Sequence, residues 1–241
     1  MQQSACATDK GKLRTVNEDS MLCMDDMSFY MVADGVGGHN SGEIASKLAV
    51  ELTKAHLTAN PPERVEESDL PDFFNRRLRE VNKEIYTRAA SVKENAGMAT
   101  TAVMLLIRQM RAYIINIGDS RAYLFRKGRL QRVTEDHTYV SELLKQGRIS
   151  KAEAEVHPKR NMITRALGSE ETMIPDFFQL DLTIGDRILL CTDGLYNEVS
   201  DEEICAMIES KPNSEELVLA LIRSACDNGG KDNITVCCVE I

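Results

Sequence analysis

The sequence predicts an α+β fold in which antiparallel β-sheets are covered by helices. Three features support this class: strand-like segments follow one another in a long central block, one pair of them is joined by a two-residue turn, and the helices occur in consecutive pairs. A tight turn implies antiparallel neighbours. Paired helices do not fit the regular alternation of strand and helix in a parallel sheet.

The predicted strands are short runs rich in Val, Ile, Leu and Tyr, most of them bounded by Gly, Asp or Asn. In chain order they cover 29–33, 102–107, 113–117, 122–125, 187–191 and 234–239. Lys127 and Gly128 separate 121–126 from 129–134, which predicts a hairpin.

Two long segments have the period of helices with one buried face, and they predict helices over 42–57 and 73–90. The apolar stripes are Ile44, Ala45, Leu48, Ala49 and Leu52 in the first and Phe74, Leu78, Val81 and Ile85 in the second. Two more helices are predicted over 201–210 and 214–228, just before the last strand. The polar, helix-prone segment 138–168 is expected to be a peripheral excursion.

Length and charge limit the possible functions. The 241 residues are expected to form a single domain spanning 1–241. The 38 acidic and 29 basic residues give a net charge of -9, which argues against sequence-independent binding to nucleic acid. This charge does not exclude a phosphorylated substrate, because metal ions supply positive charge locally.

Two features predict a cytoplasmic protein without a membrane segment. The N-terminal segment 1–12 lacks the apolar core of a secretory signal, and the apolar run 102–107 is far shorter than the ~20 residues that span a bilayer. The seven cysteines are scattered and include no C-x-x-C pair, so packed thiols are expected rather than a disulfide framework.

Four aspartates lie at the ends of predicted strands. Asp34, Asp119 and Asp193 each follow an apolar run, and Asp232 shortly precedes the last one. Any one of them alone is more simply explained as a turn or capping residue. Their recurrence indicates that they converge, and converging carboxylates repel one another unless a cation neutralises them. An all-oxygen site favours Mg²⁺ or Mn²⁺ over zinc.

Other residues near these aspartates are candidates for the same site. Gly35 belongs to a glycine-rich loop whose backbone could approach an ion closely, so its carbonyl could join the ligands. Arg14 is a candidate phosphate clamp, although a solvated charge is the simpler explanation of an isolated arginine. His39 and His137 are each either a proton donor or an ordinary loop hydrogen-bonding residue.

Seven short motifs occur in a specific order along nearly the whole chain. They are Arg14-x-x-Asn17-Glu18-Asp19, Asp34-Gly35-Val36-Gly37-Gly38-His39, Thr100-Thr101-Ala102, Gly118-Asp119-Ser120-Arg121, Asp136-His137, Cys191-Thr192-Asp193-Gly194-Leu195 and Asp232-Asn233-Ile234-Thr235. Together they resemble the type 2C, or PPM, family of protein serine/threonine phosphatases, in the form of its bacterial branch. The resemblance implies a sandwich of two antiparallel sheets flanked by helix pairs, in four layers (αββα), with 138–168 as a flap beside the active site.

The resemblance also implies metal ligands. Asp34 would bridge two ions of Mn²⁺ or Mg²⁺, and the Gly35 carbonyl would complete one shell. Asp193 and Asp232 would hold the other ion. Glu18 would contact the metals through water.

Three further roles complete the implied site. Asp119 with Asp193 would hold a third ion, and Arg14 would orient the phosphate. His39 is the candidate proton donor to the leaving group, but the eukaryotic pattern has histidine directly after Asp-Gly, where this chain has Val36. The identity of the general acid therefore stays open.

The implied activity is hydrolysis of phosphoserine and phosphothreonine in proteins by a water that bridges the metals, without a covalent phosphoenzyme. The expected partners are phosphorylated proteins, opposite a serine/threonine kinase, and the protein is expected to act as a monomer. Two alternatives stay open: a non-catalytic phosphoprotein-binding regulator on the same fold, and a phosphatase dedicated to one small ester or signalling partner.

Overall fold

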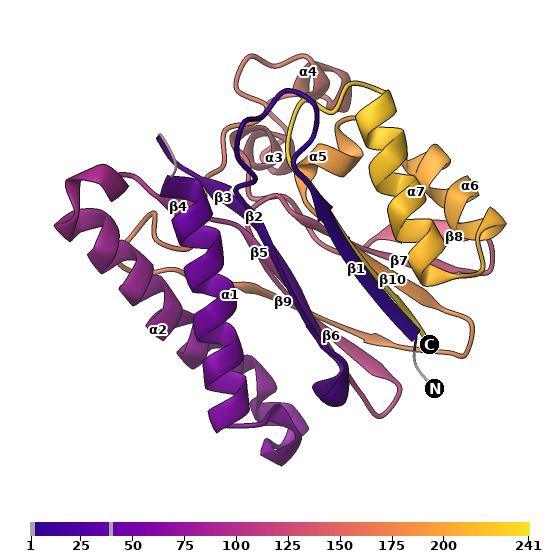
Figure 1. Cartoon of the computed structure of the whole chain (residues 1–241), viewed down its shortest axis with the longest axis horizontal. Helices are drawn as coiled ribbons and strands as arrows, with labels where there is room; N and C mark the ends of the chain where they lie inside the picture. The colour runs from indigo at the N-terminus through magenta and orange to yellow at the C-terminus, as the bar shows by residue number, and fades with distance from the viewer. Residues whose placement is uncertain (1–2, 39–40) are drawn as a thin grey trace.

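The computed structural model describes residues 3–38 and 41–241. Two antiparallel sheets pack face to face in this part of the chain (Figure 1). The first sheet has the order β1 (Gln3–Asp9), β11 (Ile234–Glu240), β10 (Arg187–Cys191), β7 (Arg121–Arg126) and β8 (Arg129–Arg132). The second has the order β2 (Asp19–Met24), β3 (Phe29–Val36), β5 (Ala102–Arg108), β6 (Arg111–Ile117) and β9 (Asp176–Asp181), and the short β4 (Ala99–Thr100) pairs with β3.

Helix pairs cover the two outer faces (Figure 1). Helices α1 (Ser41–Ala59) and α2 (Leu70–Ser91) pack on the second sheet, and α6 (Asp201–Ser210) and α7 (Ser214–Asp227) pack on the first. The predicted four-layer sandwich is therefore confirmed. Within the described residues, no helix has both the length and the apolar character needed to cross a membrane.

Shorter elements complete the chain. The segment 138–168, predicted as a flap, contains α3 (Tyr139–Lys145) and α4 (Lys151–Glu155), and α5 (Asp193–Tyr196) follows β10 directly. In Figure 1 these three helices are drawn towards the upper end of the sandwich. Single 3-10 turns occupy Asp25–Met27, Pro62–Arg64, Glu67–Asp69 and Lys93–Asn95.

The core has three layers because both faces of each sheet are covered. In β3, Phe29 and Met31 face α1 and α2, while Tyr30 and Val32 face the other sheet, and all four are buried. Side chains alternate between the faces of a strand, so a strand covered on both sides is continuously apolar. The interior strands therefore stand out in the sequence as unbroken apolar runs.

The hairpin predicted at Lys127-Gly128 joins β7 to β8, with Arg126 paired to Arg129. Both turn residues have positive φ, 51° for Lys127 and 73° for Gly128. Two consecutive positive φ values characterise the tight turn whose twist matches that of the flanking strands.

The expectation of thiols without a disulfide is wrong for one pair. Cys6 on β1 and Cys237 on β11 are direct partners in the strand register, with Cα atoms 4.0 Å apart, and they form a disulfide. Cys23 on β2 places its sulfur 2.7 Å from that of Cys6. The two bonded cysteines are 231 residues apart in the chain, so only the pairing of the terminal strands brings them together.

Candidate metal centre

The strand ends bring the predicted aspartates to one place. Asp34 lies near the end of β3, Asp119 lies in the connection from β6 to β7, and Asp193 opens α5 immediately after β10. Asp232 lies two residues before β11. The charges of Asp193, Asp119 and Asp232 each raise the pKa of the Asp34 carboxyl, so the four carboxylates lie near one another.

Asp19 is a fifth member of this cluster that the sequence analysis did not name as a ligand. It opens β2 directly opposite Asp34 in the strand register, and it is 6% exposed. Its Oδ2 accepts hydrogen bonds from the hydroxyls of Thr192 (2.9 Å) and Thr235 (2.6 Å). The sequence feature that could have identified Asp19 as a site residue is its position in the Asn17-Glu18-Asp19 motif, next to the expected ligand Glu18.

Burial and mutual repulsion disfavour the charged forms of these carboxylates. Burial raises the pKa of Asp19 and of Asp119 to about 7 and that of Asp193 to about 6, and neighbouring carboxylates act in the same direction. Burial, followed by the charges of Asp19 and Asp193, raises the pKa of Asp34 well above its ordinary value. The fold thus holds together charges that a positive ion would stabilise.

Several buried carboxylate oxygens have no hydrogen-bond partner in the described protein. They are Oε1 of Glu18 and Oδ1 of Asp19, Asp119 and Asp193. Buried polar atoms in native proteins normally have partners, so four such atoms in one cluster fit the binding of a cation. The donors are all oxygen, and these residues therefore fit hard divalent cations such as Mg²⁺ or Mn²⁺.

Gly35 and Gly42 explain how Glu18 and the first helix reach the cluster. A Cβ atom on Gly35 would lie 2.1 Å from the Gly42 carbonyl oxygen, and one on Gly42 would lie 2.7 Å from Gly35. The end of β3 therefore packs directly on the first turn of α1, backbone against backbone. Backbone N–H groups of Gly42 and Glu43 donate to the carboxylate of Glu18, whose pKa is nevertheless raised by burial.

Arg14 lies at the edge of the cluster. Its Nη2 is 2.7 Å from Oδ2 of Asp232, and about half of the side chain is exposed. Burial acts to lower the pKa of Arg14, but Asp232, Glu18 and Asp34 together raise it. Its Nε and Nη1 have no partner among residues 3–38 and 41–241, so they are available to an incoming anion.

Asn233 fixes the loop that carries Arg14 and Glu18, a function that the sequence analysis missed. Its Oδ1 accepts the backbone N–H of Glu18 (2.8 Å), and its Nδ2 donates to the carbonyls of Lys10 (2.9 Å) and Val16 (3.0 Å). The side chain is almost fully buried. The loop between β1 and β2 is therefore clamped to the start of β11.

His137 is a buried residue that hydrogen-bonds Gly118, the neighbour of Asp119. Its Nδ1 accepts the backbone N–H of Gly118 (3.0 Å), which identifies the neutral Nε2–H form, and Nε2 donates to Asp176 (3.1 Å). Burial lowers the pKa of His137. These contacts favour its interpretation as a buried hydrogen-bonding residue, and the other candidate, His39, lies outside the described residues.

The metal-free protein is expected to lose stability as the pH rises from roughly 4 to 7. Asp19, Asp119 and Asp193 have folded-state pKa values above the unfolded value of about 4. The folded state therefore binds more protons in this window, and its advantage is lost as the pH passes the folded pKa. Bound metal needs ionised carboxylates, so its stabilisation should grow over the same window.

Thermal unfolding between about pH 4 and about pH 7, with chelator and with Mn²⁺, measures both trends. A melting temperature of the chelated protein that climbs with pH, or a Mn²⁺ effect independent of pH, would contradict the expected carboxylate site.

Comparisons with known proteins agree with this centre. The model of the protein phosphatase 2C family matches residues 7–234. Serine/threonine phosphatase stp of Listeria monocytogenes is 40% identical over 97% of this chain and 93% of its own length. The crystal structure of the Mycobacterium tuberculosis serine/threonine phosphatase PstP has a TM-score of 0.90 and 37% identity, covering 100% of this chain and 98% of that one.

The catalytic domain of the phosphatase PstP has also been solved with two manganese ions. That structure has a TM-score of 0.86 and 35% identity, covering 99% of this chain and 97% of that one. A centre for two ions of Mn²⁺ or Mg²⁺ is thus supported independently of the unpartnered oxygens seen here. The family match, the identities and the shared fold lead to one conclusion: the chain belongs to the protein phosphatase 2C family.

Proposed function

We propose that residues 1–241 act as one catalytic domain that hydrolyses phosphoserine and phosphothreonine in proteins with Mn²⁺ or Mg²⁺. The observation that carries this proposal is the cluster of buried carboxylates whose oxygens lack protein partners, with Arg14 beside it. A binding module without catalysis would have no need to hold mutually repelling carboxylates together.

The proposed metal ligands are the residues that the converging strand ends bring together. Asp34 contributes to both core ions, with the Gly35 carbonyl on one and Asp193 and Asp232 on the other. Glu18 acts through water. The backbone N–H groups at the start of α1 favour the charged form of Glu18, and this supports its role.

Two additions complete the proposed set. Asp119 and Asp193 share a third ion, which is supported by an unpartnered oxygen on each. Burial and the charges of Asp193 and Asp232 raise the pKa of Asp19, so a bound cation would favour its ionised form, and its unpartnered Oδ1 is available to the ions or their water.

Divalent ions bound here supply Lewis acidity and a water of lowered pKa, which attacks phosphorus in line with the leaving oxygen. Arg14 binds the phosphate oxygens through the nitrogens that Asp232 leaves unoccupied, and it thereby orients the ester and offsets developing negative charge. Protonation of the serine or threonine oxygen is proposed for His39.

The proposed setting is a cytoplasmic phosphatase that acts as a monomer and reverses a serine/threonine kinase. The names of the bacterial relatives, such as stp and PstP, support serine and threonine phosphates as substrates. The buried sandwich core and its covering helices account for a stable fold within one chain.

Hydrolysis of a phosphothreonine peptide by the chelated protein is the direct test. No phosphate release is expected with chelator, and activity should return on addition of Mn²⁺ or Mg²⁺ because the carboxylates then regain their counterions. Phosphate release is measured alongside thermal unfolding, so that metal binding is observed independently. A folded protein that binds Mn²⁺ yet hydrolyses no phosphopeptide would favour a binding role.

A further inference from the structure

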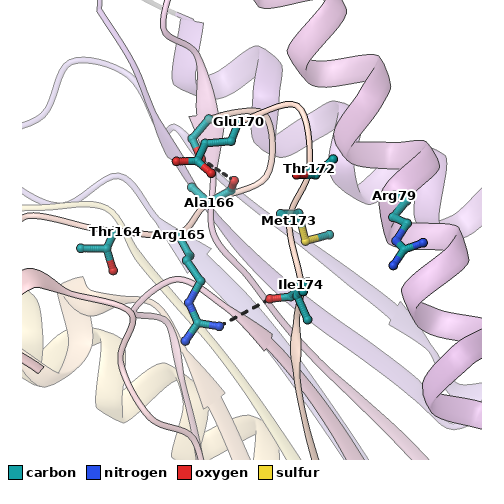
Figure 2. A pocket seen from close by; sticks show the side chains of 9 residues that line it. Arg79, Thr164, Arg165, Ala166, Glu170, Thr172, Met173 and Ile174 are labelled. Atoms are coloured by element: carbon teal, nitrogen blue, oxygen red, sulfur yellow. Dashed lines mark hydrogen bonds between the residues drawn. The ribbon is translucent and has the colours of Figure 1, made fainter. Parts of the chain in front are cut away.

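A cavity of about 610 Å³ lies between α2 and the end of the flap with the segment that follows it (Figure 2). Its lining includes Arg79 from α2 and, from the facing segment, Thr164, Arg165, Glu170, Met173 and Ile174. Figure 2 shows Arg79 on α2 across the cavity from Arg165, with Met173 and Ile174 between them. The volume is within the range of roughly 300–1,000 Å³ that is usual for ligand sites.

The two walls of this cavity are fixed to each other. Asn82 on α2 is buried, accepts the backbone N–H of Gly168 (2.8 Å) and donates to the carbonyls of Glu170 (2.9 Å) and Glu171 (3.1 Å). Gly168 has φ of +88°, and a Cβ atom there would lie 2.3 Å from the side chain of Ile85. The loop is thus held against α2, so the cavity is a preformed feature.

The wall formed by 164–167 is also tied to the metal centre. The N–H of Leu167 donates to the carbonyl of Thr100 (2.8 Å), whose hydroxyl donates to the carbonyl of Asp34 (2.8 Å). The N–H of Thr164 donates to the carbonyl of His137 (2.8 Å), the residue that binds Gly118. A peptide lying on this wall would therefore have a fixed position relative to the carboxylates.

The charges in the cavity favour an acidic occupant. Arg79 is exposed and has no hydrogen-bond or ion-pair partner among the described residues. Arg165 uses Nη1 to donate to Asp176 (2.8 Å) and to the carbonyl of Ile174 (3.5 Å), and its other nitrogens have no partner within the same part of the chain. Glu170 supplies the single carboxylate of the lining. Exposed Arg76 and Lys83 lie on the same side of α2 as Arg79, three and four residues away.

The lining thus carries two arginines and one carboxylate, in a chain with a net charge of -9. An apolar surface accompanies these charges, because Ile174 is 68% exposed at the cavity. Basic side chains around a partly apolar groove match a peptide that carries acidic residues, and such complementarity contributes to partner choice.

We propose that this cavity binds an acidic segment of the phosphoprotein near the phosphorylated residue, with Arg79 as its main determinant of specificity. The proposal rests on the proposed phosphatase function, and it defines which phosphoproteins the centre prefers. Arg165 contacts the same segment from the flap side, and Glu170 weakens its binding by repulsion.

The test compares two phosphothreonine peptides that differ only in their flanking residues, Glu and Asp in one and Gln and Asn in the other. The measured quantity is the ratio of kcat/KM for the acidic peptide to that for the neutral peptide, with Mn²⁺ present. Arg79→Glu is expected to lower this ratio about fivefold, because an exposed attraction is replaced by repulsion. Glu170→Gln is expected to raise it about twofold, because it removes a repulsive charge.

Arg88→Glu is the matched control, because Arg88 is exposed on the same helix but does not line the cavity. It changes the net charge as Arg79→Glu does, and its ratio should equal that of the parent. The ratio of the parent should also fall towards one at high salt, since exposed charges are screened.

Two failures are distinguishable. If the parent hydrolyses neither peptide, the proposed function fails. If the parent hydrolyses both, but Arg79→Glu and Glu170→Gln leave the ratio unchanged or shift it as Arg88→Glu does, the cavity is not the acidic subsite.

Discussion

Replacing Asp34 with asparagine is expected to reduce kcat about a thousandfold and to raise the melting temperature of the metal-free protein. The loss of activity follows because Asp34 faces every other aspartate of the cluster, and the chemistry of bound divalent ions lowers the barrier by several kcal/mol. The gain in stability follows because burial and neighbouring charges raise the pKa of Asp34 well above its ordinary value. Asparagine removes that repulsion while keeping the shape of the side chain.

Thermal unfolding with chelator and with Mn²⁺ tests this prediction without reference to turnover. In the parent, saturating Mn²⁺ at about 100 times its dissociation constant adds about 2.7 kcal/mol of stability. That increment should largely vanish in Asp34→Asn. Asp26→Asn, at an exposed position outside the cluster, is the control. Full activity together with an undiminished Mn²⁺ increment in Asp34→Asn would exclude Asp34 as a metal ligand.

Arg14→Ala is expected to raise KM for a phosphothreonine peptide about thirtyfold, because a charged hydrogen-bonding group that binds phosphate contributes a few kcal/mol. Mn²⁺ should bind at least as tightly as in the parent, since the substitution removes a positive charge that lies 2.7 Å from Asp232. The two effects have opposite signs, and peptide kinetics and Mn²⁺ titration measure them separately.

Arg14→Lys distinguishes charge from geometry at this position. Lysine keeps the positive charge but lacks the planar fork of arginine, so it should recover only part of the lost affinity for the peptide. Equal losses of Mn²⁺ and peptide binding in Arg14→Ala would mean that Arg14 has a structural role in the loop.

The strands that the sequence predicted are mostly interior strands. Strands β3, β5, β6, β7, β10 and β11 have neighbours on both sides, and the cores that cover both of their faces require unbroken apolar runs. Of the strands missed, β1, β2 and β9 are at sheet edges, and β4 has only two residues. An edge strand is partly exposed and tolerates polar residues, as in the Gln-Ser-Ala-Cys-Ala-Thr-Asp sequence of β1. The edge strand β8 was found only because the hairpin turn marked it.

In the candidate site, too, residues beside strands with a strong local pattern were predicted, and residues that depend on strand pairing were not. Asp34, Asp119, Asp193 and Asp232 were visible because each lies beside a strand with a strong local pattern. Asp19 was not singled out, because it opens the edge strand β2 and its proximity to Asp34 depends on the pairing of two strands. Asn233 was missed as a clamp because the groups it binds, at Lys10, Val16 and Glu18, are more than 200 residues away in the chain.

By itself the sequence determined the interior strands, the four covering helices and the oxygen-rich character of the centre. Each of these depends on local periodicity or on residue type, which the order of residues displays directly. Only the tertiary structure decided the Cys6–Cys237 disulfide, the packing of Gly35 on Gly42 and the cavity between α2 and the flap. These features join segments that are distant in the chain, and their existence depends on how closely two backbones approach, which no local pattern specifies.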